Sequence, residues 1–180
     1  KIEGKKVIAT LKKGQDKPSN QVTSNENATI VLFSGELDKA LAAMVIANGA
    51  ASMGKKVSVF ATFWGLNFLR KEAPVMVKKT FVEKMFGMMM PKGANKLPLS
   101  KMQMAGLGKA MMLNVMKQKN VETLPNLMTQ AMELGVNFIA CTMSMDVMGI
   151  KKEELIDGIS YGGVATYLAE SEDAGLTLFI

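Results

Sequence analysis

Cys141 is the only cysteine among the 180 residues and the only soft nucleophile in the chain. It follows the apolar run 136–140 and precedes Thr142 and Ser144, residue types that favour helix starts. A thiol at the point where a strand gives way to a helix meets unpaired backbone N–H groups, which favour the thiolate and lower the pKa of the thiol. The pattern therefore predicts a reactive cysteine. The alternative that stays open is a buried cysteine acting as a small apolar side chain.

The composition excludes several other kinds of chemistry. The chain has no histidine, which excludes Ser-His-Asp triads, Cys-His dyads and histidine-ligated metals. A single cysteine excludes an intrachain disulfide, a CxxC redox pair and a multi-thiolate metal site. Neither the phosphate-binding GxxxxGK[ST] pattern nor the dinucleotide-binding GxGxxG pattern occurs. We therefore expect no metal and no cofactor, and we expect the backbone or a lysine to activate Cys141.

Other polar groups have simpler interpretations. Glu36 and Asp38 open a predicted helix, where acidic residues are favourable without being catalytic. Gly162 and Gly163 predict a turn, although a pair of glycines before a helix is also compatible with anion binding. The acidic residues near the end of the chain are expected on a solvated face rather than at a metal; they are Glu153, Glu154 and Asp157.

Segment 70–120 differs in composition from the rest of the chain. It carries eleven basic residues against two glutamates, a net charge of +9, while residues 121–180 carry −7 and the whole chain +6. It also holds ten of the 17 methionines. Arg70 is the only arginine and aromatic residues make up 6% of the chain, so few groups are available to grip phosphates or stack on bases, and we predict no nucleic-acid partner. A flexible methionine surface favours packing or adaptable contacts with a protein partner over binding of a soft metal.

Short β-rich runs alternate with amphipathic stretches along the chain. We predict strands over residues 5–11, 29–33, 56–63, 136–140 and 176–180. We predict helical segments over residues 37–53, 75–90, 102–119, 123–134, 142–149, 151–156 and 164–171. Residues 14–27 are polar and predict a linker. Strands that alternate with helices predict an α/β fold with a mainly parallel sheet.

Three predicted strand ends carry the residues of interest. Ser34-Gly35, Trp64-Gly65 and Cys141-Thr142 each follow a predicted core strand. In a parallel sheet the carboxyl ends of the strands share one edge, and ligands bind outside that edge where the strand order reverses. We therefore expect these residues to meet at one site.

Four separated segments resemble the DsrE/DsrF-like family: IVLFSGELDKA (30–40), TFWGLN (62–67), GMMMPKG (87–93) and ACTMSMDVMG (140–149). More narrowly, they resemble its Met-rich branch, whose members are often fused to coenzyme A-disulfide reductases or described as peroxiredoxin-like. Residues 1–14, and especially VIATLKKG (7–14), resemble the final strand of a TusA-like sulfur-carrier domain. The resemblance implies a tail and linker over residues 1–27, as a remnant of a TusA-like domain. It also implies a DsrE-like domain over 28–180, with a Met-rich insertion at about 73–120.

The resemblance further implies a flavodoxin-like three-layer α/β sandwich, a homo-oligomer, and sulfur relay in which a cysteine after a core strand carries sulfur as a persulfide. Cys141 occupies that position. No second cysteine is available to resolve the persulfide, so a partner has to bring the other thiol. The partner implied is a sulfur carrier or a protein of the disulfide-reductase type.

These observations lead to one functional hypothesis and one alternative. The hypothesis is a cytoplasmic, sulfurtransferase-like persulfide carrier with Cys141 as its catalytic residue. The residues expected to contact its substrate are Ser34, Gly35, Trp64, Thr142 and Ser144. The alternative is a non-catalytic interaction module whose basic, Met-rich surface binds a protein partner, a membrane surface or a small anionic ligand. Of these three partners, a membrane surface is the least favoured. We also predict no membrane-spanning helix, because no uncharged stretch reaches the roughly 18 apolar residues that such a helix needs.

Overall fold

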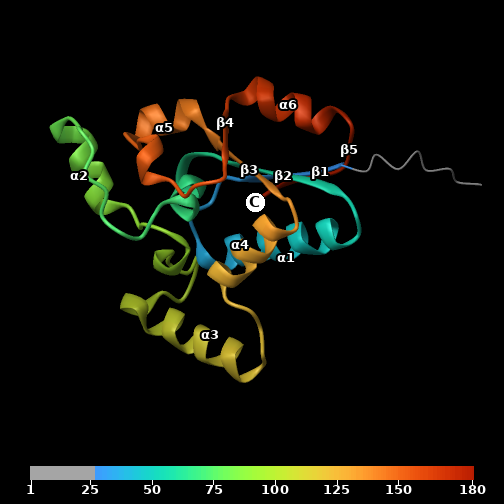
Figure 1. Cartoon of the computed structure of the whole chain (residues 1–180). Coiled ribbons are helices and arrows are strands. Elements are labelled where there is room, and N and C mark those ends of the chain that lie inside the picture. Colours follow the sequence, from blue (N-terminus) through green and yellow to red (C-terminus); the bar gives the residue numbers. More distant parts are fainter. Residues whose placement is uncertain (1–26) are drawn as a thin grey trace, which may run out of the picture.

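A computed structural model describes residues 27–180. Five parallel strands form one sheet in the order β4-β3-β2-β1-β5 (Figure 1). The strands are β1 (Asn27–Leu32), β2 (Lys56–Ala61), β3 (Asn137–Cys141), β4 (Ser160–Gly162) and β5 (Ala174–Phe179). The predicted strand over residues 5–11 and most of the predicted tail lie outside the described residues.

Helices cover both faces of this sheet. Helices α1 (Leu37–Ser52) and α4 (Leu124–Glu133) lie together on one face, and α6 (Val164–Glu172) lies on the other (Figure 1). Helix α5 (Thr142–Met148) follows β3 directly and contacts the short helix η1 (Phe63–Leu69) at the carboxyl edge of the strands. The predicted flavodoxin-like three-layer α/β arrangement with a parallel sheet is confirmed.

The two faces of the sheet are buried to different depths. The main core lies between the sheet and α1/α4, and includes the fully buried Leu32, Val59 and Phe138. The opposite face has a much smaller buried cluster of Val31, Phe60, Ile139 and Cys141, covered by the partly buried Tyr167 of α6. Helix α6 itself has no buried residue. Cys141 therefore lies under the thinner of the two layers.

The strand order reverses beside β1. The chain runs outward from β1 through β2 and β3 to β4, then returns with α6 on the other face to place β5 next to β1. Because β1, β2 and β3 are neighbours and parallel, the residues that follow them share one edge of the sheet, as predicted for Ser34, Trp64 and Thr142.

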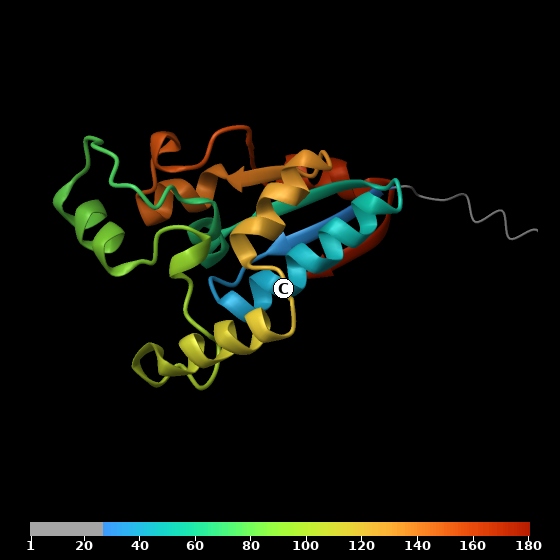
Figure 2. The same cartoon turned by 60° about the horizontal axis from the view of Figure 1, so that its bottom comes forward.

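The Met-rich insertion contains shorter helices than the sequence predicts. Helix α2 (Phe81–Met89) begins at the capping box of Thr80 and Glu83, and α3 (Leu107–Gln118) begins after Gly106, which has φ of 96°. The preceding residues 75–80 and 102–106 have apolar spacing compatible with a helix, but the cap and the left-handed backbone delay the helix start. Figure 2 shows both helices projecting from the body formed by the sheet and its helices. Two short 3₁₀ turns, η2 (Ala94–Lys96) and η3 (Met104–Gly106), complete the segment.

The insertion is tied to the start of α1. The amide of Leu37 donates to the carbonyl of Pro98 at 2.7 Å. The carboxylate of Asp38 accepts from the amide and the hydroxyl of Ser100, at 2.9 and 2.6 Å. Burial acts most strongly on the pKa of Asp38 and raises it, but the bonds from Ser100, its own backbone amide and Lys39 together outweigh burial, so the pKa lies below its ordinary value. Asp38 therefore anchors the insertion.

Two local predictions near the end of the chain are wrong. Residues 160–162 form the edge strand β4, where a turn was predicted, because three residues are too few to show a period and pairing with β3 alone defines them. Glu154, predicted on a solvated face, is buried at the end of η4 (Lys152–Glu154), where it pairs with Arg70. Residues 27–180 include no helix long and apolar enough to cross a lipid bilayer.

Gly65 provides a test of how tightly η1 packs on the end of β1. A Cβ added at Gly65 would lie 2.0 Å from the carbonyl oxygen of Leu32 and 2.7 Å from its carbon. Because both atoms are backbone, the clash cannot be relieved by a side-chain rotation. Gly65→Ala is therefore expected to lower the free energy of unfolding by about 2–3 kcal/mol in urea denaturation.

The matched control is Gly49→Ala in α1. A Cβ there has open space around it, and alanine is the better helix former. This variant should gain about 0.5–1 kcal/mol. Equal stabilities for the two variants would contradict the close approach of η1 to β1.

Candidate functional site

Cys141 lies where β3 ends and α5 begins. It is the last residue of the strand and the N-cap of the helix, with an extended backbone (φ −69°, ψ 111°). The apolar residues before it are buried in the strand, and the polar residues after it begin the helix, as the sequence predicts. The residue is 1% exposed. Cys141 is therefore buried, as the alternative interpretation expects. Whether the thiol is also inert depends on the polar groups around the sulfur.

Four hydrogen-bond donors surround the Cys141 sulfur. Burial acts most strongly on the pKa of the thiol and raises it. Against burial act hydrogen bonds from the hydroxyl and amide of Ser144, the hydroxyl of Thr62 and the amide of Met143. Together they hold the pKa of Cys141 below its ordinary value. The sulfur is thus enclosed but surrounded by groups that stabilise a thiolate.

The two hydroxyls at the sulfur also bond each other. The Oγ1 of Thr62 and the Oγ of Ser144 are 2.8 Å apart, both residues are buried, and either can be the donor. Each hydroxyl carries one proton, so when one proton lies between the two oxygens only the other can point at the sulfur. The pair therefore acts as one unit.

The residue after Thr62 has an unusual backbone. Phe63 has φ of 45°, in the left-handed region that costs a residue with a Cβ about 1–2 kcal/mol. Its ring packs against Phe33, with centroids 5.5 Å apart. This turn redirects the chain from β2 into η1 immediately after Thr62, whose side chain bonds Ser144.

Three of the predicted substrate-contacting residues line a separate cavity. Ser34, Gly35 and Trp64 border a space of about 380 Å³ at the ends of β1 and β2. The hydroxyl of Ser34 donates to Glu36 at 2.8 Å, and Lys39 pairs with the same carboxylate at 2.5 Å. Lys39 and then Ser34 hold the pKa of Glu36 below its ordinary value. Cys141 is not among the residues lining this cavity.

The other two predicted contacts differ from each other. Ser144 is fully buried at the sulfur. Thr142 is partly exposed, and its hydroxyl donates to the carbonyl of Gly162 at 3.4 Å. The structure therefore groups Ser144 with Cys141, and Ser34, Gly35 and Trp64 with one another. Thr62 was missed by sequence reasoning, because only its position at a strand end hinted at a role.

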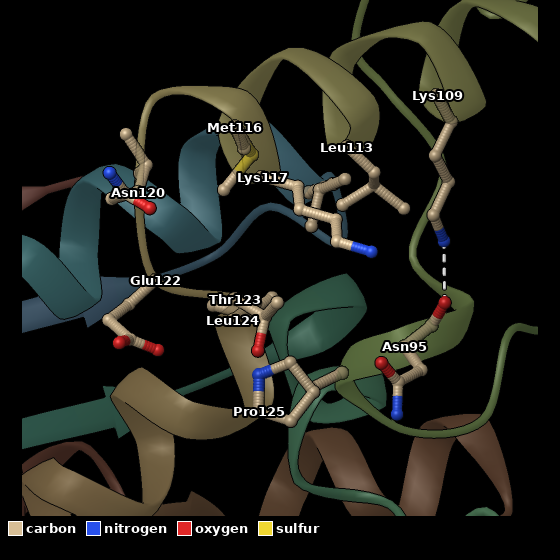
Figure 3. A pocket seen from close by; sticks show the side chains of 13 residues that line it. Asn95, Lys109, Leu113, Met116, Lys117, Asn120, Glu122, Thr123, Leu124 and Pro125 are labelled. Carbon is tan, nitrogen blue, oxygen red and sulfur yellow. Dashed lines mark hydrogen bonds between the residues drawn. The ribbon is translucent and has the colours of Figure 1, made fainter.

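A further cavity of about 450 Å³ lies between α3 and the start of α4 (Figure 3). Lys109 at its border donates to the carbonyls of Asn95 and Leu97, at 2.5 and 2.8 Å. Burial, with a smaller effect of Lys96, lowers the pKa of Lys109. None of the predicted site residues lines this cavity, and Lys109 serves to hold α3 against the segment before it.

The shared-proton arrangement at Cys141 can be tested with Thr62→Val and Ser144→Ala. In either single variant the remaining hydroxyl has its proton free for the sulfur, so the pKa of Cys141 should rise only slightly. The double variant loses both hydroxyls and should raise the pKa by more than the sum of the single effects. The measurement is the pH dependence of thiolate ultraviolet absorbance. Its midpoint in the unmodified protein should lie below about 8.5.

Thr142→Val is the matched control, because the hydroxyl of Thr142 bonds a carbonyl rather than the sulfur. It should leave the midpoint unchanged. Single effects that add up to that of the double variant would contradict a shared proton.

The chain is similar to several known proteins. The model of the DsrE/DsrF/DrsH-like family matches residues 24–179. The chain is 57% identical over 155 residues to "Uncharacterized protein YrkE" of Bacillus subtilis (strain 168), covering 86% of this chain and 97% of that protein. It is 35% identical over 155 residues to "Sulfur carrier protein DsrE2" of Allochromatium vinosum, covering 84% and 96%.

A solved structure, that of the YchN protein from E. coli, aligns with a TM-score of 0.48 and 11% identity, over 86% of this chain and 99% of that one. The family match spans the whole sheet, including all the strand ends described above. This chain belongs to the DsrE/DsrF/DrsH-like family.

Proposed function

We propose that this protein is a sulfur-relay protein that accepts sulfane sulfur on Cys141 as a persulfide and passes it to a partner thiol. The observation that carries the proposal is the set of hydrogen-bond donors at the Cys141 sulfur, which lowers the pKa of the thiol in spite of its burial. Family membership supports it, as does the similarity to a protein named as a sulfur carrier.

The proposed transfer has two displacement steps. The Cys141 thiolate attacks the outer sulfur of a donor R–S–SH. A bond forms between Sγ and that sulfur, the donor S–S bond breaks, and RS⁻ leaves with the electron pair and takes up a proton. In the second step a partner thiolate attacks the outer sulfur of Cys141–S–SH, and Cys141 leaves as the thiolate. The two steps need no external oxidant or reductant.

The donors around Cys141 favour both steps of the relay. In the first step they favour the ionised form of the nucleophile. In the second they stabilise the departing thiolate, and a thiol of lower pKa leaves faster. Because Cys141 is the only cysteine of the chain, the persulfide cannot collapse into an internal disulfide. The partner therefore supplies the receiving thiol.

Access to Cys141 requires its cover to open. The covering layer is α6, whose Tyr167 packs on Phe60 with ring centroids 5.3 Å apart and closes the small cluster that contains Cys141. A helix with no buried residue contributes little packing energy and belongs to the parts of a fold that open most easily. In this proposal, opening at α6 exposes the sulfur. The cavity bordered by Ser34, Gly35 and Trp64 binds the rest of the donor molecule or part of the partner protein. A contact between Thr142 and the substrate stays a prediction.

Tyr167→Ala tests the cover. Loss of the ring should ease opening at α6 and increase the rate of Cys141 alkylation by iodoacetamide about tenfold at fixed pH. Tyr167→Phe, which keeps the ring, is the matched control and should react like the unmodified protein. Urea denaturation separates this local effect from a global loss of stability. An unchanged alkylation rate in Tyr167→Ala would show that the thiol is reached by another route.

Persulfide formation itself is tested by mass spectrometry after treatment with polysulfide. The folded protein should gain about 32 Da, one sulfur atom, on the peptide that contains Cys141. Incubation with an excess of a small thiol should then remove the added sulfur. Cys141→Ser is the control and should gain nothing. An unmodified thiol, or equal labelling of folded and urea-unfolded protein, would contradict activation by the fold.

A further inference from the structure

A buried ion cluster lies where the Met-rich insertion meets the rest of the fold. Glu154 pairs with Arg70 through Oε1 at 3.1 Å and with Lys79 through Oε2 at 2.5 Å. The side chains of Arg70, Lys79 and Glu154 are 1%, 6% and 10% exposed. The amide of Lys151 also donates to Glu154, at 2.9 Å. Each carboxylate oxygen of Glu154 therefore has at least one partner.

This cluster carries one positive charge that no carboxylate of the cluster neutralises. Two cations share a single carboxylate, so the three buried side chains carry a net charge of +1. Three other acidic residues of this region have partners of their own: Glu83 pairs with Lys151 at 2.7 Å, Asp157 with Lys71 at 3.1 Å, and Glu72 accepts from the side-chain amide of Asn95 at 2.6 Å. The Nε of Arg70 is buried and has no acceptor within the described residues. An uncompensated buried charge is costly, and the cluster is completed most directly by an anion.

A cavity opens onto this cluster. Its volume is about 660 Å³, and Lys79, Gly87 and Glu154 are among the residues that line it. Three further lysines border the same space: Lys78, Lys84 and Lys92. None of these three forms an ion pair within residues 27–180. We call this space the basic cavity; its concentration of positive charge attracts anions from solution.

A glycine lies beside the buried cations at the border of the basic cavity, which Lys79 lines. Gly87 lies inside α2, where glycine costs about 0.5–1 kcal/mol relative to alanine. A Cβ at this position would lie 3.5 Å from the Nζ of Lys79 and 3.9 Å from the Nη2 of Arg70. A small side chain would fit in ordinary contact, and a larger one would cover both cations. The glycine thus leaves Lys79 uncovered on the side of the cavity.

We propose that the basic cavity binds a doubly charged oxyanion of the phosphate or thiosulfate class. Such an ion has several oxygen acceptors arranged in a tetrahedron, which suits donors that converge from the buried cluster and from the lysines on the border. Two negative charges neutralise the excess charge of the cluster and one bordering lysine. The site does not involve Cys141 and is independent of the proposed sulfur relay.

Titration calorimetry and thermal unfolding of the intact chain test this proposal. Sodium phosphate and sodium thiosulfate are compared with sodium chloride at equal ionic strength, and Cys141→Ser is titrated in parallel. Binding of either oxyanion, with a rise in melting temperature beyond that in chloride and the same affinity in Cys141→Ser, supports the site. A response to thiosulfate alone identifies a sulfur compound as the ligand, and a response to phosphate alone identifies a phosphoryl group. No response to either beyond chloride overturns the proposal.

Two variants locate the binding. Lys84→Gln/Lys92→Gln removes two bordering charges and should weaken the affinity about tenfold. Gly87→Leu should abolish binding by covering the Nζ of Lys79, and circular dichroism checks that this variant is folded.

Lys101→Gln/Lys119→Gln, at exposed positions that do not line the cavity, is the control of equal charge and should bind like the unmodified protein. An equal loss in both double variants would show general charge attraction and overturn the site. Full binding by a folded Gly87→Leu variant would overturn it as well.

Discussion

The hydrogen bond between Thr62 and Ser144 is the interaction on which the arrangement at Cys141 depends. It joins residues 82 positions apart in the chain, at 2.8 Å and fully inside the protein. Parallel pairing of β2 with β3 brings the two strand ends together, and the turn at Phe63 follows immediately after Thr62. Without that pairing the sulfur would keep only the donors of its own helix, which are Ser144 and the amide of Met143.

The protein holds two polar centres that differ in their physical character. At Cys141 the cost of burial is offset by the hydroxyl pair of Thr62 and Ser144 and by two backbone amides, all supplied by the protein itself. In the basic cavity the protein supplies more positive than negative charge, so the balance has to come from outside. The ion pair of Lys151 with Glu83 connects the segment after α5 to α2. It therefore links the part of the fold that holds Cys141 to the insertion that borders the basic cavity.

Much of the fold could be predicted from local patterns. The buried strands β1, β2 and β3 and the helices α1, α4 and α5 follow from apolar runs, caps and glycine stops. Prediction failed where local signals are weak or mislead. The strand β4 has too few residues to show a period, and the methionines before α2 and α3 fit a helix that the backbone does not form. Glu154 was assigned to a solvated face because its neighbours are charged, whereas its partners come from distant segments.

The sequence by itself determined the chemistry available to this protein: one thiol, no imidazole, an alternating α/β chain and a basic Met-rich segment. These are properties of composition and of short-range order, which a single chain displays directly. Only the tertiary structure decided that Thr62 reaches the sulfur, that Tyr167 covers it, and that Arg70 and Lys79 share one carboxylate. The reason is that polar side chains find partners at neighbouring strand ends and between the Met-rich insertion and the rest of the fold. Those partnerships depend on strand order and packing, which local periodicity does not encode.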